Sequence, residues 1–177
     1  MTDTTTDTTT ERIHDPIHRA SYTFRREGGS LWVSTWLEDE GHLPEHFHPS
    51  LEEHWEALEG TVRVKLDGTW RDLRPEDGRV AVAPGVRHEL KNESGRQASL
   101  RAEVIPGGRL ESFLTESARA AREGLFNRHT LPTSLRGAAW IADFALRFQD
   151  ETVMCSPPPA VQRVVLPVVA RLSRRAR

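Results

Sequence analysis

The sequence predicts a mainly β protein with a helical C-terminal part, and three observations lead to this prediction. Short segments of alternating apolar and polar residues fill the chain between residues 21 and 105. Glycine-containing turns separate these segments at close intervals. After Pro106-Gly107-Gly108 the apolar residues change to helical spacing. Short, evenly spaced strands of this kind are typical of a β-barrel or a β-sandwich.

The alternation is clearest in three segments of the β region, residues 31–37, 61–66 and 79–83. Each is a run of four to eight residues in which apolar side chains recur at every second position, as in a half-buried strand. The intervening turns are expected at Gly28-Gly29, Asp67-Gly68 and Asp77-Gly78.

The two ends of the chain differ from this β region. Residues 1–15 begin with an almost unbroken series of Thr and Asp, so we expect a disordered tail there and a β domain over residues 16–106. Residues 107–177 form the predicted helical extension. Its three apolar stripes are Leu110, Phe113, Leu114 and Ala118; Trp140, Ile141, Phe144, Ala145 and Phe148; and Val161, Val164, Val165, Val168, Val169 and Leu172. Pro167 should bend or interrupt the last helix.

Composition excludes several classes of protein. The 177 residues carry 24 basic and 26 acidic side chains, and the formal net charge of −2 gives no overall field that would attract nucleic acid. The single cysteine, Cys155, excludes an internal disulfide and suggests a reducing compartment. We find neither an apolar run of membrane-spanning length nor a secretion signal, so the sequence predicts a cytoplasmic protein that does not associate with membranes.

The first candidate functional residues are His46 and His48. Side chains two residues apart on a β-strand point to the same side, so both imidazoles can reach one atom. Such a pair alone is a weak signal, because a polar strand face can carry two histidines without any chemical role. His42 and His54 are lesser candidates, more consistent with surface or supporting positions, whereas His14, His18 and His129 show no functional pattern in the sequence.

The pair stands within a longer motif. His46-x-His48 is followed after four residues by Glu53 and after six more by Gly60. This spacing resembles the first motif of the cupin superfamily, although Gly41, if it is the leading glycine, lies one residue too close to the histidines. A second motif of that superfamily ends in a glycine, a histidine and an asparagine.

The chain meets that second motif at Gly85, His88 and Asn92. It departs from it earlier, since Ala83 stands where a proline is expected and Asp77 stands where a glycine is expected. Both departures affect a turn and leave the ligand positions in place. The resemblance covers residues 30–106. The helical extension, chiefly at Asn127-Arg-His-Thr-Leu-Pro and Pro157-Pro-Pro-Ala-Val-Gln-Arg, is similar to that of a group of single-domain bacterial cupins.

The resemblance implies a double-stranded β-helix, the cupin or jelly-roll barrel, holding one divalent transition metal ion on His46, His48, Glu53 and His88. Three imidazole nitrogens and one carboxylate suit Fe, Mn, Zn, Ni or Cu better than Ca or Mg. Glu52 competes with Glu53 for the carboxylate position. The interval to Gly60 selects Glu53, because strand alternation turns Glu52 to the other face.

Four protein ligands leave two positions open on a metal that prefers six, which is typical of a catalytic site. We therefore expect a metal-dependent enzyme that acts on a small organic molecule, most plausibly an Fe(II)-type dioxygenase. A non-redox isomerase, lyase or polyketide-cyclase type of enzyme remains an alternative, as does a metal-containing binding module without turnover.

Four further residues are candidates for the pocket. Trp55 has the strand parity of Glu53, and Trp32 and Trp36 share a face, so all three are candidates to line a substrate pocket, with plain core packing as the alternative. Glu103 is the candidate catalytic residue for moving a proton, with a solvent-facing position as the alternative. We expect the helical extension to pack on the outer sheet or in a homodimer interface; a lid over the barrel mouth is the alternative.

Overall fold

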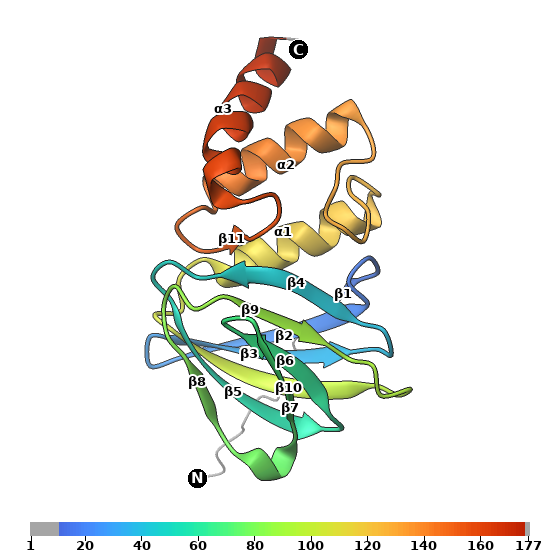
Figure 1. Ribbon diagram of the computed structural model, residues 1–177, viewed down its shortest axis with the longest axis vertical. Helices are drawn as coiled ribbons and strands as arrows, with labels where there is room; N and C mark the ends of the chain where they lie inside the picture. Colours follow the sequence, from blue (N-terminus) through green and yellow to red (C-terminus); the bar gives the residue numbers. More distant parts are fainter. Residues whose placement is uncertain (1–10, 176–177) are drawn as a thin grey trace, which may run out of the picture.

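The computed structural model describes residues 11–175 and shows two antiparallel β-sheets that face each other, with three helices at one end (Figure 1). The six-stranded sheet has the order β1 (Ile13–Asp15), β2 (Ala20–Glu27), β3 (Ser30–Leu37), β10 (Ala98–Ile105), β5 (Glu52–Glu59) and β8 (Val80–Val82). The five-stranded sheet has the order β11 (Val153–Met154), β4 (His42–Phe47), β9 (His88–Lys91), β6 (Val62–Leu66) and β7 (Thr69–Leu73). A 3-10 turn at Pro75–Asp77 precedes β8.

The core lies between the two sheets, and strand alternation decides which side chains reach it. In β3 every second residue is buried, beginning with Leu31 and ending with Leu37. The central strand β10 pairs with β3 on one side and β5 on the other, so that Ala102 faces Val33 and Trp55 across its two ladders. These three residues are all buried, which makes this the apolar centre of the barrel.

The β domain begins earlier than expected. Residues 1–10 lie outside the described part of the chain, whereas Ile13–Asp15 forms β1 and pairs with β2. The prediction of disorder up to residue 15 is therefore wrong for these three residues. Composition could not reveal that Asp15 fixes the turn after β1, where its carboxylate accepts hydrogen bonds from the backbone N–H groups of Ile17 and His18.

The three helices are α1 (Leu110–Arg122), α2 (Leu135–Arg147) and α3 (Pro159–Arg175). Ser134 caps α2 by accepting a hydrogen bond from the backbone N–H of Gly137 at 3.1 Å. Gly137 is required there, because a Cβ at this position would lie only 2.1 Å from the carbonyl oxygen of Leu125. Pro167 does not interrupt α3, which continues on both sides of it.

The helices cover one end of the barrel, on the side of β4 and β11 (Figure 1). Leu110, Phe113 and Leu114 of α1 pack against the barrel core, and α2 packs against α3. All three helices also line the interior cavity described below. The expectation that the extension packs on the outer sheet is therefore wrong, and the alternative of a cap over the barrel mouth describes the structure. The apolar stripes showed that the helices must be buried but not against which surface.

Aromatic side chains hold α1 and α2 together, and Phe148 lies among them. Its ring centroid is 5.0 Å from that of Phe144 and 5.7 Å from that of Phe113, and only 3% of Phe148 is exposed. Phe148→Ala should lower the free energy of unfolding by about 3–5 kcal/mol, because it leaves a cavity in a closely packed cluster. Leu135→Ala is the matched control, since Leu135 is 90% exposed and its loss should change stability by less than about 0.5 kcal/mol. Denaturant unfolding measures both, and equal effects would contradict this packing.

Candidate metal centre

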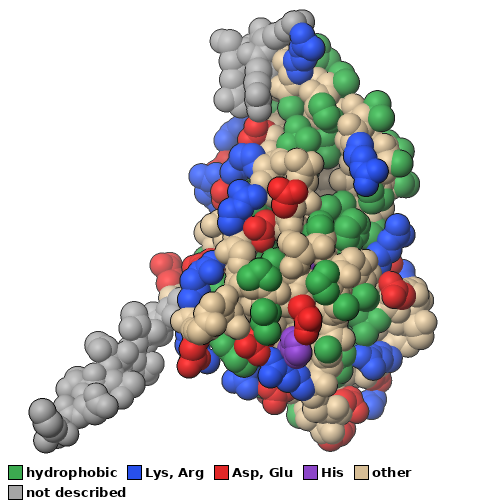
Figure 2. Space-filling view, turned by 90° about the vertical axis from the view of Figure 1, so that its left-hand side faces the viewer, with side chains coloured by type: hydrophobic (Ala, Val, Ile, Leu, Met, Phe, Trp, Pro, Cys, Tyr) green, Lys and Arg blue, Asp and Glu red, His purple; other side chains and the backbone are tan. Residues whose placement is uncertain are grey.

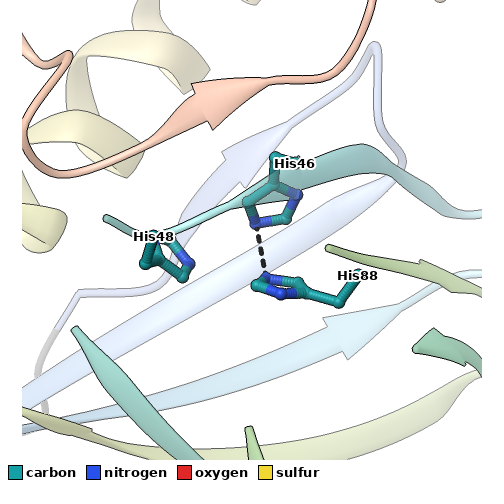
Figure 3. Close-up of side chains that lie close together, drawn as sticks. All are labelled: His46, His48 and His88. Atoms are coloured by element: carbon teal, nitrogen blue, oxygen red, sulfur yellow. Dashed lines mark hydrogen bonds between the residues drawn. The ribbon is translucent and has the colours of Figure 1, made fainter. Parts of the chain in front are cut away.

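The site is built first from two neighbouring strands of the five-stranded sheet. His46 lies near the end of β4 and pairs directly with His88, the first residue of β9. His48 is the first residue after β4, two positions beyond His46, so its side chain lies on the same side of the strand as that of His46. Figure 3 shows the three imidazoles turned toward one another, with a dashed line between His46 and His88.

The donor atoms of these residues converge on one point. The Nε2 atoms of His46 and His88 are 3.1 Å apart, and one ring nitrogen of each of the three histidines lies within 4.8 Å of the others. Glu53 reaches them from β5 in the opposite sheet, where its Oε2 lies 3.4 Å from His88 Nε2 and 3.6 Å from His48 Nε2. The Trp55 indole N–H donates a hydrogen bond to the same oxygen at 3.1 Å, which holds the carboxylate in place.

Backbone carbonyls fix the orientation of all three rings. The Nδ1 of His46 lies 2.8 Å from the Pro44 oxygen, that of His88 lies 3.0 Å from the Val86 oxygen, and that of His48 lies 2.7 Å from the Glu151 oxygen. A carbonyl can only accept, so each Nδ1 must carry the proton. Each Nε2 then keeps its lone pair for a cation, which is the arrangement that metal-binding histidines usually show.

Burial changes the protonation of these groups in the way a metal site needs. It lowers the pKa of His46 to about 4, with the neighbouring His48 as a second cause, and it also lowers the pKa values of His48 and His88. Burial raises the pKa of Glu53. Three neutral imidazoles and one carboxyl, which has no Lys or Arg partner among residues 11–175, form a donor set that a divalent cation would complete. The residues therefore fit a transition metal ion.

This protonation state leads to a pH prediction. An imidazole binds metal only when it is deprotonated, and the lowered pKa of His46 extends the deprotonated range downward from the usual value of about 6.5. Bound metal should therefore stay constant on acidification from neutral pH to about pH 5 and should fall as the pH approaches about 4. Elemental analysis after dialysis at each pH measures this. Loss of most metal near pH 6.5 would mean that the three imidazoles are ordinary exposed ligands.

The competing carboxylate, Glu52, points elsewhere. Its side chain is about half exposed and makes a hydrogen bond with the His54 imidazole on the outer face of β5. Glu53, by contrast, is 7% exposed and faces the three histidines. Strand alternation thus turns Glu53 toward the histidines and Glu52 to the outer face, as the interval to Gly60 predicts.

A cavity of about 470 Å³ adjoins the three histidines and Glu53. Barrel residues form one part of its wall, and side chains from all three helices form the other, among them Phe113 of α1, Phe144 of α2 and Leu166 of α3. The wall is mainly apolar, and the three histidines and Glu53 are concentrated in one part of it. Such a cavity suits a small, largely apolar molecule that binds the metal through one polar end.

Of the three candidate pocket tryptophans, only Trp55 lies inside. Its ring centroid lies 5.1 Å from that of His88, and the Trp55 side chain lines the cavity. The placement of Trp32 and Trp36 in the pocket is wrong. Trp32 lies on the outer face with the Arg79 and Arg101 guanidinium groups 5.6 and 5.3 Å from its ring centre. The Arg12 guanidinium covers the Trp36 ring at 3.6 Å.

The reason is the parity of β3. Its inward positions are Leu31, Val33, Thr35 and Leu37, and both Val33 and Thr35 line the cavity. The sequence showed that the tryptophans share a face, but large aromatic side chains suggested the wrong face. Arginine stems and guanidinium groups cover these rings from outside. The tryptophan rings are therefore partly shielded from water although they lie outside the core.

Glu103 is also misplaced as a catalytic residue. It lies opposite Trp32 in the ladder between β10 and β3, on the outer face of the sheet. Its carboxylate accepts hydrogen bonds from Arg79 and from the Ser30 hydroxyl, and these lower the pKa of Glu103. The inward neighbours Ala102 and Val104 are buried instead. Glu103 therefore contributes to a surface ion pair. This is the solvent-facing position named above as the alternative to a catalytic role.

The structure also adds one polar pair that motif reasoning missed. Asp15 and His18 are both buried and both line the cavity. His18 lies outside the cupin motifs, so nothing in their spacing pointed to it. The only available signal was the local series Asp-Pro-Ile-His, in which an aspartate begins a turn and can reach a histidine three residues later.

Comparison with known proteins places these observations in context. No family model matches the chain. An oxidoreductase of Arthrobotrys oligospora is 35% identical over 54 residues, which cover 30% of this chain and 21% of that protein. The chain thus spans about a fifth of the length of that curated relative.

Solved structures resemble the barrel. An RmlC-like cupin from Shewanella frigidimarina superposes with a TM-score of 0.51 at 19% identity, over 58% of this chain and 89% of that one. A double-stranded β-helix protein from Klebsiella pneumoniae gives 0.47 at 18% identity, over 54% and 84%. A sugar phosphate isomerase from the cupin superfamily of Silicibacter pomeroyi gives 0.49 at 16% identity, over 54% and 71%.

The chain therefore has the cupin fold, with C-terminal helices added to the barrel, and the predicted fold class is confirmed. Its three clustered histidines can hold a metal ion, which defines the class of site. Among the described residues, no helix combines the length and the apolarity needed to cross a membrane.

Proposed function

We propose that this protein is a metal-dependent enzyme that acts on a small, largely apolar organic molecule, as an Fe(II)-type dioxygenase. The observation that carries the proposal is the convergence of three Nε2 atoms and the Glu53 carboxylate beside a mainly apolar cavity. A site with donors but no adjoining space would suit a structural metal instead.

The residues of the site have distinct roles in this proposal. His46, His48 and His88 would hold the ion through Nε2, and Glu53 would supply the negative charge that favours a divalent cation. When bound, Fe(II) would supply redox chemistry with O₂ and open positions for substrate oxygens. The Trp55 N–H would keep the Glu53 carboxylate oriented, and the apolar wall would exclude water from the reacting molecule.

The wall also supports a substrate class. Four aromatic side chains from the helical part line the cavity: Phe113, Phe126, Trp140 and Phe144. Their rings form a continuous series, with centroid distances of 6.1 Å between Phe126 and Trp140, 4.5 Å between Trp140 and Phe144, and 4.9 Å between Phe144 and Phe113. Flat or aromatic molecules suit such a surface, so we propose substrates with a ring and an oxygen-bearing end that reaches the metal.

The test compares metals under controlled oxygen. The purified chain, loaded with Fe(II) or with Zn(II), is incubated with a panel of catechols, flavonols and 1,3-diketones, and O₂ uptake is recorded beside mass spectra of the products. We expect O₂-dependent product formation with Fe(II) only. Glu103→Gln should behave like the unchanged chain, because Glu103 lies on the outer face.

Other outcomes would replace this proposal. Turnover with Zn(II) and without O₂ would indicate a non-redox isomerase, lyase or cyclase. Tight binding of a panel member without turnover under either metal would indicate a binding module.

We also propose that the chain forms a homodimer through α3. Figure 2 shows hydrophobic side chains gathered on one face of the helical part. The exposed ones on α3 are Val161, Val164, Val165, Val168 and Leu172. Their spacing forms one stripe along the helix, and an identical stripe of a second copy would cover it about a twofold axis. Light scattering should therefore give the mass of a dimer, and Val164→Glu with Val168→Glu should give a monomer. A monomeric unchanged chain would contradict this proposal.

A further inference from the structure

The cavity wall contains a buried polar pair apart from the candidate metal ligands, formed by Asp15 and His18. Asp15 is 1% exposed and His18 is 9% exposed. One carboxylate oxygen of Asp15, Oδ1, accepts the backbone N–H groups of Ile17 and His18 at 2.9 and 3.0 Å. The other, Oδ2, lies 2.8 Å from His18 Nδ1. The His18 ring is thus held in one orientation by its own turn.

This hydrogen bond also decides where the imidazole proton lies. Because the Asp15 carboxylate acts as the acceptor, Nδ1 of a neutral His18 carries the proton and Nε2 keeps its lone pair. Nε2 is buried and has no hydrogen-bond partner within residues 11–175. Buried polar atoms almost always have a partner, so an orphaned acceptor beside a cavity indicates a ligand that supplies a donor.

The surroundings of His18 show what kind of ligand this would be. The His18 ring lies 5.8 Å from the Phe126 ring, which in turn stacks on Trp140 at 6.1 Å. All three side chains line the same cavity as the three metal-binding histidines. A molecule there would meet an aromatic surface with the His18 imidazole next to it.

We propose that His18 is a substrate-binding residue, whose Nε2 accepts a hydrogen bond from a hydroxyl group on an aromatic ligand, and that Asp15 is its positioning residue. The hydroxyl is distinct from the oxygens that reach the metal. The ligand class is therefore a ring system with a hydroxyl group separate from its metal-binding end. This inference rests on the proposed function in one respect, because it takes the cavity as the substrate site.

A pair of probes tests the proposal, one with a hydroxyl group and one in which a methyl group replaces the hydroxyl hydrogen. 2-Naphthol can donate a hydrogen bond, whereas 2-methoxynaphthalene has a similar shape and cannot. Isothermal titration of the full chain should show that 2-naphthol binds about 3- to 10-fold more tightly, the factor expected for one buried hydrogen bond. The titration is done with and without metal, so that a failure of metal binding does not affect the comparison.

Two variants assign the preference to this pair. His18→Phe keeps a planar ring but removes the acceptor, so it should bind both probes equally. In Asp15→Asn the amide oxygen can still accept the backbone N–H groups while the amide N–H donates to Nδ1, which moves the imidazole proton to Nε2. The preference for 2-naphthol should then disappear, and nitrogen NMR shifts of His18 should show the exchanged tautomer.

Three results would overturn the proposal. They are equal binding of the two probes by the unchanged chain, an undiminished preference in His18→Phe, and no binding of either probe up to its solubility limit. A preference that persists in metal-free protein supports the proposal even if the protein proves not to be an iron enzyme.

Discussion

Replacing His46 and His48 together with alanine is expected to abolish metal binding, from about one transition metal ion per chain to almost none. The two residues supply two of the three ring nitrogens that lie within 4.8 Å of one another, so the double variant leaves one imidazole and one carboxylate. Two ligands cannot fix the geometry that a transition metal ion requires. Elemental analysis of protein expressed in metal-supplemented medium measures the difference.

His54→Ala is the matched control for this experiment. His54 also lies on a strand beside a carboxylate, but its partner is Glu52 on the outer face. The control should keep the metal content of the unchanged chain. Equal metal content in the double variant and the unchanged chain would mean that the ion binds elsewhere. A circular dichroism spectrum checks that the double variant is folded.

The second large effect is expected from Glu53→Gln. The substitution removes the negative charge that lies 3.4 and 3.6 Å from the Nε2 atoms of His88 and His48 while it keeps the size of the side chain. We expect metal affinity to fall by more than the roughly 10- to 100-fold that follows loss of a group outside the coordination sphere. Competitive titration of the metal-free variant against a chelator of known affinity measures the change.

Glu52→Gln provides the comparison, because the residue is adjacent in sequence and its carboxylate points to the outer face. Its metal affinity should equal that of the unchanged chain. Similar losses in both variants, or a larger loss in Glu52→Gln, would show that the strand register differs from the one described.

The sequence predicted well which candidate ligands the structure brings together, because each belongs to a motif with a fixed spacing. His46 and His48 share a strand face at any register, and Glu53 is separated from Glu52 by alternation alone. The structure places these three residues and His88 around one point. Motif spacing is informative here because the four side chains can reach one point only when the residues between them have certain numbers and conformations.

Residues outside the motifs were harder to place, since nothing in the sequence determined which face of the strand their side chains occupy. Trp32 and Trp36 were correctly assigned to one face, but the choice between the two faces depended on which of them could be covered from outside. Arg79 directly before β8, Arg101 of β10 and Arg12 of the N-terminal segment provide that cover. Such contacts join residues far apart in sequence, so a strand pattern cannot reveal them.

The helical extension illustrates the same limit at a larger scale. Its apolar stripes predicted three helices, and helices are present at all three places. The stripe on α1 faces the barrel, whereas much of the stripe on α3 is exposed. Helical periodicity shows that a face is apolar, but only tertiary structure shows whether the same chain covers that face.

The most direct measurement is X-ray diffraction from crystals of metal-loaded protein, with anomalous data collected at the absorption edge of the bound ion. We expect one strong anomalous peak at about 2.0–2.2 Å from Nε2 of His46, His48 and His88 and from a carboxylate oxygen of Glu53. The peak should adjoin the cavity beneath α1 and α2. A peak bound by other residues, or by Nδ1 rather than Nε2 of these histidines, would contradict it.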